Sequence, residues 1–519
     1  MSSFFKAHYD VIVIGAALAG LSAAIELRRA GLDVLVLEQH SLPGGVATSY
    51  LRKGVEIEAS LHEMCSVGTE AHPLRIRQYF ERLGHPVEWI KIPYCFRYIS
   101  PSIDMELPCG ENGDFTKPID AIVKAVGDKD GTLRESLEDF FELCKQVQHS
   151  MDELSVKPMG KIKMFLKHRP FVITSGYTCR EIFDFFRFPK EVEEILSAYW
   201  VYLGSPIADL PFSIYAYILS DYIGSGPFIP KHTSYELSAK LEAGAKDLGV
   251  HVEYGCRVDK VLVHDGKVTG VRLTNGEEIA TEQVICGAYP NTVYGRMIEP
   301  AEEVPVKAKK WVNSTDLGVS VFSVVLLLDK EAQELGIKDY ATFISPRGLA
   351  SEFYYQQGLG DGEWDYLTVV CPNIVHKDAS YKGTCLYSIT YLPHGSSIQG
   401  LSPEQYEEYK RKHVQQFLDA ESKRLGVDLR SHIIEIIVET PVTISHYTGA
   451  YLGTIYGYRH TMHTNVAART LTKGDDRFIR GLYFAGAHQL AGDGMAPQID
   501  NGTAAAKEAL SDRKKGKRA

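Results

Sequence analysis

Three small residues and one carboxylate near the start of the chain have the spacing of a dinucleotide-binding turn. Gly15, Ala17 and Gly20 stand where a G-x-G-x-x-G turn places its glycines, and Glu38 follows Gly15 by 23 residues. At that distance an acidic residue binds a ribose hydroxyl, while a helix N-terminus faces the pyrophosphate. The methyl group of Ala17 adds bulk but removes no N–H donor, so we expect a slightly displaced phosphate and a retained site.

The flanking residues predict the strand, helix and strand that such a turn requires. Residues 9–14 are apolar and β-branched, which is typical of a strand buried on both faces. Residues 18–30 are rich in Ala, Leu and Glu and predict a helix that Gly31 ends, and residues 34–37 predict the second strand. Alone, this pattern also fits an α/β unit that binds no nucleotide.

A second glycine pair follows the acidic residue. The stretch Leu42–Met64, "LPGGVATSYLRKGVEIEASLHEM", places Gly44 and Gly45 just past Glu38. The order of these motifs resembles the FAD-binding start of the amine oxidase and phytoene desaturase superfamily, and most closely its branch of carotenoid isomerases and retinol saturases. The resemblance implies that the glycine pair lies against the pyrophosphate. Val46 departs from the family's polar or basic residue, and Arg52 could supply that charge.

The C-terminal region carries a second part of the same resemblance. Residues 480–510, "RGLYFAGAHQLAGDGMAPQIDNGTAAAKEAL", resemble the family's strand, glycine loop and helix beneath the isoalloxazine, with the helix starting near Gln498. Residues 236–291 predict a helix followed by hairpins, with turns at His264-Asp265-Gly266 and Asn275-Gly276. In the family, the backbone at the position of Val258 caps the adenine. His488 stands in a tripeptide that differs from the family's usual Thr-His-Pro.

Together these motifs imply FAD as the cofactor and a defined set of site residues. The implied cofactor-binding residues are Gly15, Ala17, Leu18, Ala19, Gly20, Glu38, Gln39, Gly44, Gly45, Val46, Ala47, Thr48, Arg52, Val258, Gly486, Asp493, Met495 and Ala496. For a proton-transfer step the candidates are His62, Tyr447, His488 and Asp493. Histidine and tyrosine are usable acids at the edge of a flavin ring, whereas aspartate needs a raised pKa.

Composition excludes several other classes of protein. The 519 residues are 45% hydrophobic with a formal net charge of −10, which is unlike a nucleic-acid-binding protein. The nine cysteines are odd in number and form no C-x-x-C pair, so we expect no metal site, no disulfide framework and a reducing, cytoplasmic compartment. The N-terminus does not resemble a signal peptide, and no uncharged apolar run reaches the roughly 18–20 residues of a membrane helix.

The expected fold is α/β, with a discontinuous Rossmann-type FAD-binding domain and an inserted α+β substrate domain. We expect residues 1–75, 225–300 and 435–519 to form the former and residues 76–224 and 301–434 the latter. A dedicated nicotinamide domain would need a second dinucleotide motif, and none is apparent. Electrons would therefore be exchanged with an external donor or acceptor, or would cycle without net transfer.

The substrate side is expected to be apolar. Residues 171–228 are rich in aromatics, most of which would form a helical core while some line a tunnel. The stretch Leu210–Pro230 is either buried or an apolar surface for peripheral membrane contact. Residues 318–330 predict a strand under the pocket, and residues 439–462 predict a polar loop that faces the cofactor.

These features support one leading hypothesis and two alternatives. The leading hypothesis is an FAD-dependent oxidoreductase that desaturates, saturates or isomerises carbon–carbon bonds of an apolar unsaturated substrate such as a carotenoid, retinoid or other lipid. The first alternative is a flavin amine oxidase. The second is a flavoprotein whose FAD is structural and takes no part in catalysis.

Overall fold

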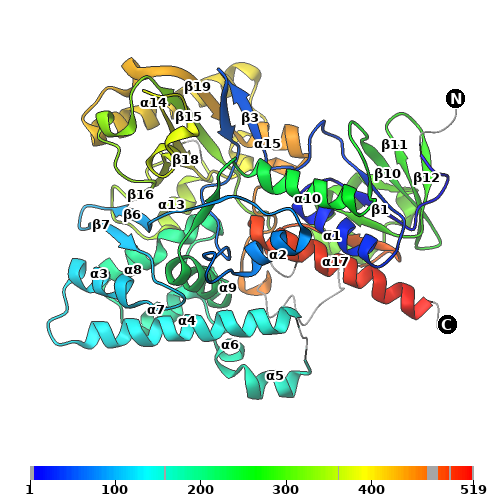
Figure 1. Ribbon diagram of the computed structural model, residues 1–519, viewed down its shortest axis with the longest axis horizontal. Helices are drawn as coiled ribbons and strands as arrows, with labels where there is room; N and C mark the ends of the chain where they lie inside the picture. The colour runs from blue at the N-terminus through cyan, green and yellow to red at the C-terminus, as the bar shows by residue number, and fades with distance from the viewer. Residues whose placement is uncertain (1–4, 157–158, 361, 465–476, 490–491, 517–519) are drawn as a thin grey trace.

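The structure, a computed structural model, describes residues 5–156, 159–360, 362–464, 477–489 and 492–516. It confirms the predicted α/β class: a parallel sheet with its helices forms one half of the molecule, and a larger mixed sheet with a helical layer forms the other (Figure 1). The two halves are linked by several chain crossings, because each is built from segments that are distant in the sequence.

The first half is built on a five-stranded parallel sheet. Its spatial order is β20-β13-β1-β2-β9, which corresponds to the first five strands of the Rossmann order 3-2-1-4-5-6. The strands are β20 Leu482–Phe484, β13 Val284–Cys286, β1 Val11–Ile14, β2 Val34–Leu37 and β9 His251–Glu253. Strands β1, β2, β13 and β20 are buried at every position, as the apolar runs predict.

Two helices pack on this sheet at unusually short range. They are α1, Leu18–Arg29, and α17, Met495–Gly516. A Cβ atom at Gly502 would lie 2.0 Å from the carbonyl oxygen of Ala19 and 2.1 Å from Oγ of Ser22, so only glycine allows this approach. The close contact fixes the C-terminal helix beside the first glycine turn. Helix α17 begins three residues before the predicted start at Gln498.

An antiparallel layer completes this half. The predicted hairpins are confirmed as β10 Val258–His264, β11 Lys267–Leu273 and β12 Glu278–Ala280, and β14 Ile298–Glu299 pairs with β10. Three further helices belong to this part of the chain: α10 Tyr235–Asp247, α11 Pro290–Thr292 and α12 Val306–Asn313.

The second half contains a seven-stranded sheet of order β19-β15-β18-β17-β16-β6-β7, in which only β16 and β6 pair in parallel. The strands are β19 Ile433–Glu439, β15 Phe322–Leu328, β18 Cys385–Tyr391, β17 Leu367–Val370, β16 Ala341–Ile344, β6 Tyr94–Ile99 and β7 Asp104–Pro108. The strand predicted within residues 318–330 is confirmed as β15, at an interior position of this sheet.

Helices cover the lower part of this sheet in Figure 1. They are α3 Thr116–Val126, α4 Thr132–Val156, α5 Lys161–Lys167, α6 Arg169–Thr174, α7 Cys179–Phe186, α8 Lys190–Ser197 and α9 Phe212–Ile218. The remaining helices are α2 Arg75–Leu83, α13 Ser351–Gln357, α14 Pro403–Leu425 and α15 Pro441–Thr448, and two short ribbons pair β3 Ser49–Arg52 with β4 Val55–Glu58 and β5 Trp89–Lys91 with β8 Phe228–Pro230.

The predicted domain segments map onto these halves in a simple way. Residues 1–75, 225–300 and 435–519 supply all five strands of the parallel sheet, and residues 76–224 and 301–434 supply most of the seven-stranded sheet. Strand β19 straddles the expected boundary at residue 435. The division into two domains stays a prediction about independent units.

The stretch Leu210–Pro230 is not an apolar surface. It forms α9, a π-helical turn and β8, and most of its side chains are buried in the core under α4. Of its apolar and aromatic residues, only Tyr217 and Ile218 are partly exposed. Both of them line an internal cavity. Membrane contact through this stretch is therefore excluded.

Candidate functional site

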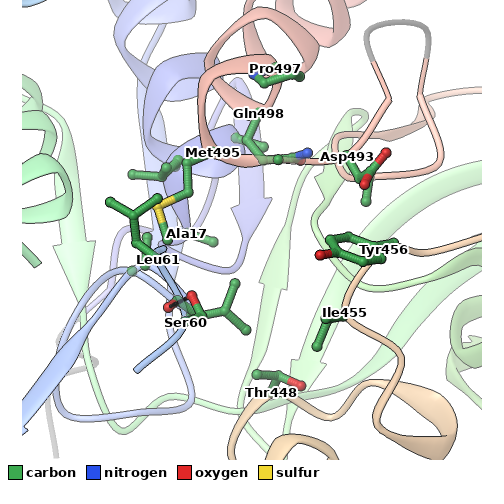
Figure 2. Close-up of a pocket in the computed structure, with 18 of the residues that line it drawn as sticks. Ala17, Ser60, Leu61, Thr448, Ile455, Tyr456, Asp493, Met495, Pro497 and Gln498 are labelled. Atoms are coloured by element: carbon green, nitrogen blue, oxygen red, sulfur yellow. Dashed lines mark hydrogen bonds between the residues drawn. The ribbon is translucent and has the colours of Figure 1, made fainter. Parts of the chain in front are cut away.

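A cavity of about 2400 Å³ is lined by residues from both large sheets. Ordinary ligand pockets measure roughly 300–1,000 Å³, so this one has room for a dinucleotide and an elongated second ligand together. Figure 2 shows one part of it, with Ala17 and Met495 on one side of the opening and Ile455 and Tyr456 on the other.

Most of the residues predicted to bind a cofactor line this cavity. They come from the turn after β1, the end of β2, the second glycine pair, the start of β10 and the start of α17. The residues are Gly15, Ala17, Leu18, Ala19, Gly20, Glu38, Gln39, Gly44, Gly45, Val46, Ala47, Val258, Gly486, Asp493, Met495 and Ala496.

Three predicted residues do not line the cavity. Arg52 lies at the tip of the β3–β4 ribbon, where its guanidinium packs over the ring of Tyr50, so it does not supply the charge expected beside the glycine pair. Thr48 lies just before β3 outside the lining. His488 is buried behind Gly486, among the rings of Tyr289, Tyr458 and Phe484.

The first glycine turn retains what an anionic ligand needs. Helix α1 begins at Leu18, and Ala17 provides no side-chain cap, so the first N–H groups of the helix and its positive dipole end face the cavity. A Cβ atom at Gly45 would lie 3.3 Å from Cβ of Ala17. The extra methyl group of Ala17 is therefore accommodated by glycine on the opposite segment, and the donors of the turn stay open.

Glu38 is held at the end of β2 by the same turn. Its Oε2 accepts the N–H of Ala16 at 2.7 Å and its Oε1 accepts the N–H of His40 at 2.8 Å. The residue is only 8% exposed and lines the cavity. The carboxylate is thus oriented by two backbone donors and keeps lone pairs free for the hydroxyls of a ribose. The residues present fit an adenine dinucleotide.

The start of α17 forms the next part of the wall. Asn501 donates from Nδ2 to the carbonyl oxygens of Gly486 and Gly492, at 3.0 and 2.9 Å, which ties the glycine loop to the helix. Asp493 is buried and pairs with Nε2 of His460 at 2.5 Å. Sequence reasoning placed His460 in a cofactor-facing loop, whereas the structure places it behind Asp493.

The other half of the cavity is largely apolar. Its wall includes one face of the seven-stranded sheet and the inner side of the helical layer. The aromatic-rich segment led us to expect that some of its residues would line such a wall. Its apolar and aromatic lining residues include Val201, Tyr202, Leu203, Ile214, Tyr222, Val321, Val325, Tyr340, Val370, Leu386 and Leu392, and the sheet also contributes the hydroxyl residues Ser323, Thr368, Ser388 and Thr390. Such a surface suits an elongated hydrocarbon ligand.

The remaining two proton-transfer candidates occupy opposite environments. His62 lies inside the cavity, and burial lowers the pKa of its imidazole to about 4, so it is neutral at pH 7. Tyr447 lines the rim, is 57% exposed, and its ring centroid lies 6.0 Å from that of His40. It therefore lies beside the Glu38 segment, away from the apolar half.

Sequence reasoning missed a carboxyl group that lies next to His62. Glu63 is 4% exposed and lines the cavity, and neither of its oxygens makes a hydrogen bond of ordinary geometry to a described residue. Burial raises the pKa of Glu63 to about 8, with the hydroxyls of Tyr202 and Tyr199 opposing the shift. Nothing in the local sequence distinguishes this glutamate from a surface one.

A second buried carboxyl lines the cavity at the end of β19. Glu439 accepts a hydrogen bond of 2.8 Å from the hydroxyl of Tyr50, and burial raises the pKa of Glu439 to about 7. Its neighbour Glu58 is satisfied differently, by the backbone N–H groups of Ser60, Leu61 and Ser234. Glu439 is therefore partnered, in contrast with Glu63.

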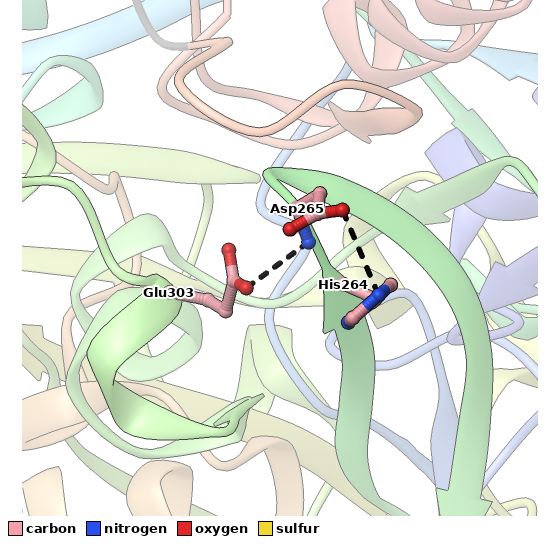
Figure 3. Close-up of side chains that lie close together, drawn as sticks. All are labelled: His264, Asp265 and Glu303. Atoms are coloured by element: carbon pink, nitrogen blue, oxygen red, sulfur yellow. Dashed lines mark hydrogen bonds and ion pairs between the residues drawn. The ribbon is translucent and has the colours of Figure 1, made fainter.

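One group of metal-type side chains occurs among the described residues, at an exposed hairpin tip away from the cavity (Figure 3). It consists of His264, Asp265 and Glu303. The Glu303 carboxylate accepts the N–H groups of Asp265 and Gly266 at 3.1 and 2.9 Å, so its role is to cap the turn. The group carries no argument for a metal centre.

The burial of Glu63 predicts a pH-dependent cost in stability. Because its pKa rises from an ordinary 4.5 to about 8 on folding, the folded state loses stability as pH rises through this window. Replacing it by Glu63→Gln removes that loss. Urea titrations measure the free energy of unfolding of both proteins. The amount by which the variant exceeds wild type should be about 4 kcal/mol larger at pH 8 than at a pH below about 4.5. A difference that does not change with pH would contradict the assigned protonation.

Comparison with known proteins agrees with this geometry. The chain matches the family described as flavin containing amine oxidoreductase over residues 18–510. Among curated proteins it is 24% identical to a prolycopene isomerase of Daucus carota, over 86% of this chain and 72% of the relative. It is 22% identical to an all-trans-retinol 13,14-reductase of Danio rerio, over 92% and 82% of the two chains.

Solved structures share the fold. The chain superposes on a putrescine oxidase with a TM-score of 0.63 at 14% identity, covering 97% of this chain and 98% of that one. A cyclohexylamine oxidase of Brevibacterium oxydans IH-35A gives a TM-score of 0.56 at 15% identity, covering 98% and 100%. The predicted cofactor FAD is confirmed by the family match, which covers residues 18–510 and so includes α1, Glu38 and the C-terminal loop. The chain belongs to the flavin containing amine oxidoreductase family.

Proposed function

We propose that this protein is an FAD-dependent oxidoreductase that acts on a carbon–carbon bond of an elongated, apolar, unsaturated substrate. The observation that carries the proposal is the continuity of one cavity, from the dinucleotide half at Glu38 to the apolar face of the seven-stranded sheet. Relatives named for prolycopene isomerisation and retinol reduction support it. When bound, FAD supplies a hydride donor or acceptor.

The residues of the chain divide the work of binding along the cavity. The uncapped N-terminus of α1 faces the pyrophosphate, and Glu38 binds the ribose. The start of α17 at Met495 presents N–H donors and a positive dipole end to the ring system, where negative charge is stabilised. The apolar half excludes water and aligns the substrate chain. Electrons are exchanged with an external donor or acceptor, or return to the same substrate during isomerisation.

Proton handling falls to groups inside the cavity. His62 is neutral at pH 7, where it is a weak base whose ring offers one N–H donor and one acceptor nitrogen. Asp493 also lines the cavity, and His460 pairs with it from behind. His488 and Tyr447 are less suited to this role, because the first lies outside the lining and the second is exposed beside Glu38. We assign the step to His62 or Asp493.

Approach of the substrate involves a membrane surface near α5. In this seven-residue helix Ile162, Phe165 and Leu166 are 81%, 48% and 76% exposed, whereas Met164 lines the cavity. The exposed basic residue Lys163 lies among these apolar residues, and exposed Arg169 follows them. Helix α5 projects at the lower edge of the molecule (Figure 1). No helix among the described residues is long and apolar enough to cross a bilayer.

Glu38→Ala should reduce the flavin content of the purified protein. The ribose loses a charged acceptor worth roughly 1.5–3 kcal/mol, and the turn loses its bonds from Ala16 and His40. The ratio of flavin to protein absorbance after dialysis measures the effect. Glu253→Ala is the matched control, because Glu253 ends neighbouring β9, pairs with His251 and does not line the cavity. Stoichiometric flavin in Glu38→Ala would refute the placement of the ribose.

Anaerobic reaction of the flavin-loaded protein with polyenes and amines tests the reaction class. A cis-carotenoid and all-trans-retinol should give products that differ from the substrate by two hydrogens or by double-bond geometry, measured by chromatography and mass spectrometry. Alkylamines should remain unchanged. Rapid oxidation of an amine would favour the amine oxidase alternative, and a flavin that cannot be photoreduced and reoxidised would favour a structural role.

Substitutions on α5 test the membrane surface. The double variant Ile162→Glu/Leu166→Glu should lower the fraction of protein that floats with anionic phosphatidylglycerol vesicles several-fold, because it removes the exposed apolar side chains and adds like charge. Leu51→Glu is the control, since Leu51 is a similarly exposed leucine on the β3–β4 ribbon, at 67%. Equal flotation of wild type and the double variant would contradict this assignment.

A further inference from the structure

Two neighbouring polar groups on the cavity wall make no hydrogen bond of ordinary geometry to a described residue. They are the Glu63 carboxyl and the Tyr202 hydroxyl, and their polar atoms are buried from solvent. They face each other at close range, and a hydrogen-bonding interaction between them lowers the pKa of the Glu63 carboxyl and raises the pKa of the Tyr202 hydroxyl. A buried polar group without a hydrogen bond destabilises the folded state. This pair therefore destabilises the protein unless a ligand forms hydrogen bonds with it.

Several backbone groups around Glu63 are already hydrogen-bonded. The hydroxyl of Tyr340 donates to the carbonyl oxygen of His62, and that of Tyr222 donates to the carbonyl oxygen of Glu63 at 3.2 Å. Met64 pairs in both directions with Phe228, at 2.8 and 2.9 Å. The segment is therefore held rigidly, and its nearby carbonyl groups are occupied. The Glu63 side chain and the hydroxyl of Tyr202 are cavity-lining groups at this place without a hydrogen bond of ordinary geometry to a described residue.

The electrostatics of this place favour a protonated carboxyl. Burial and the two phenols are the influences on Glu63, and no lysine or arginine of the described chain is among them. A protonated carboxyl and a phenol both offer O–H donors. An ammonium ligand would instead need several acceptors and an ionised partner. The donors that the wall offers suit a ligand atom with lone pairs.

We propose that Glu63 and Tyr202 form a subsite that hydrogen-bonds a hydroxyl or carbonyl oxygen of an otherwise apolar substrate. This inference rests on the proposed function, because it names a feature of the same substrate. A single polar anchor in an apolar cavity fixes how far an elongated chain enters, and so selects which carbon–carbon bond faces the flavin. An oxygen-bearing polyene is therefore preferred over the matching hydrocarbon.

The test compares ligands that differ at one end only. All-trans-retinol, its deoxy hydrocarbon analogue with a methyl group in place of the alcohol, and retinylamine are titrated into the flavin-loaded protein, and quenching of tryptophan fluorescence gives each Kd. The variants are Glu63→Leu, Glu63→Gln and Tyr202→Phe. Glu194→Leu and Tyr366→Phe are matched controls, because each alters a buried group of the same type that does not line the cavity.

Wild type should bind the alcohol roughly tenfold more tightly than the hydrocarbon, as expected for a satisfied buried hydrogen bond. Glu63→Leu should reduce this ratio to near one without weakening hydrocarbon binding. Tyr202→Phe should reduce the ratio in part, and Glu63→Gln should retain some of it because the amide still donates. Both controls should keep the wild-type ratio even if they lower the melting temperature.

Four results would overturn the inference. Equal binding of alcohol and hydrocarbon by wild type, or an unchanged ratio in Glu63→Leu, would remove the subsite while leaving the proposed function intact. Tightest binding of retinylamine with dependence on Glu63 would reassign the subsite to a cation. Binding of none of the three ligands would contradict the subsite and the proposed function together.

Discussion

The close backbone contact between α1 and α17 is the constraint on which the site depends. Because Gly502 has no side chain, the backbone of the C-terminal helix approaches the Ala19 carbonyl oxygen so closely that a Cβ atom at Gly502 would clash with it. This approach brings the start of α17 beside the turn after β1, although the two are almost the whole chain apart. The glycine loop, the uncapped end of α1 and Glu38 then share one cavity. A looser crossing would open the site between its two main binding elements.

The nucleotide half was predictable from sequence because its determinants are local. A glycine turn, an uncapped helix and a carboxylate at a strand end lie within one short stretch, and their spacing is set by the strand–helix–strand unit itself. The methyl group of Ala17 was a departure whose consequence depends on Gly45, across the turn. Arg52 and His488 show the limit of such reasoning, because a ribbon tip and a turn of the chain direct them away from the cavity.

For the substrate half, the sequence predicted the apolar character of the cavity but not the residues that line it. The aromatic-rich segment indicated an apolar core with some lining residues, but the sequence does not say that Tyr202 and Tyr222 reach the cavity while Tyr199 stands behind. Length and apolar character did not predict exposure either. The long apolar stretch Leu210–Pro230 is buried in the core, whereas the short, lysine-bearing α5 exposes apolar side chains. Burial is decided by packing between distant segments, which periodicity alone does not encode.

The buried carboxyl of Glu63, which makes no hydrogen bond of ordinary geometry to a described residue, is a distinctive chemical feature of the cavity. A chain selected for stability alone would fill such positions with apolar residues, since a buried acid without a partner destabilises the fold. Glu439 accepts a hydrogen bond from Tyr50, whereas the Glu63 oxygens make no hydrogen bond of ordinary geometry to a described residue, in a wall that combines apolar side chains with hydroxyl and other polar groups. The imbalance points to recognition of a mostly apolar ligand by very few polar contacts, which is how specificity is achieved in such cavities.

The central claim is that one cavity holds FAD end to end with an apolar substrate. An experimental structure of the protein purified with its flavin and a bound polyene tests it most directly. We predict that the adenine ribose lies at Glu38, the pyrophosphate at the start of α1 and the ring system beside Met495. The polyene should lie along Val321, Val325 and Val370. Flavin density elsewhere, or a polyene in a separate cavity, would contradict it.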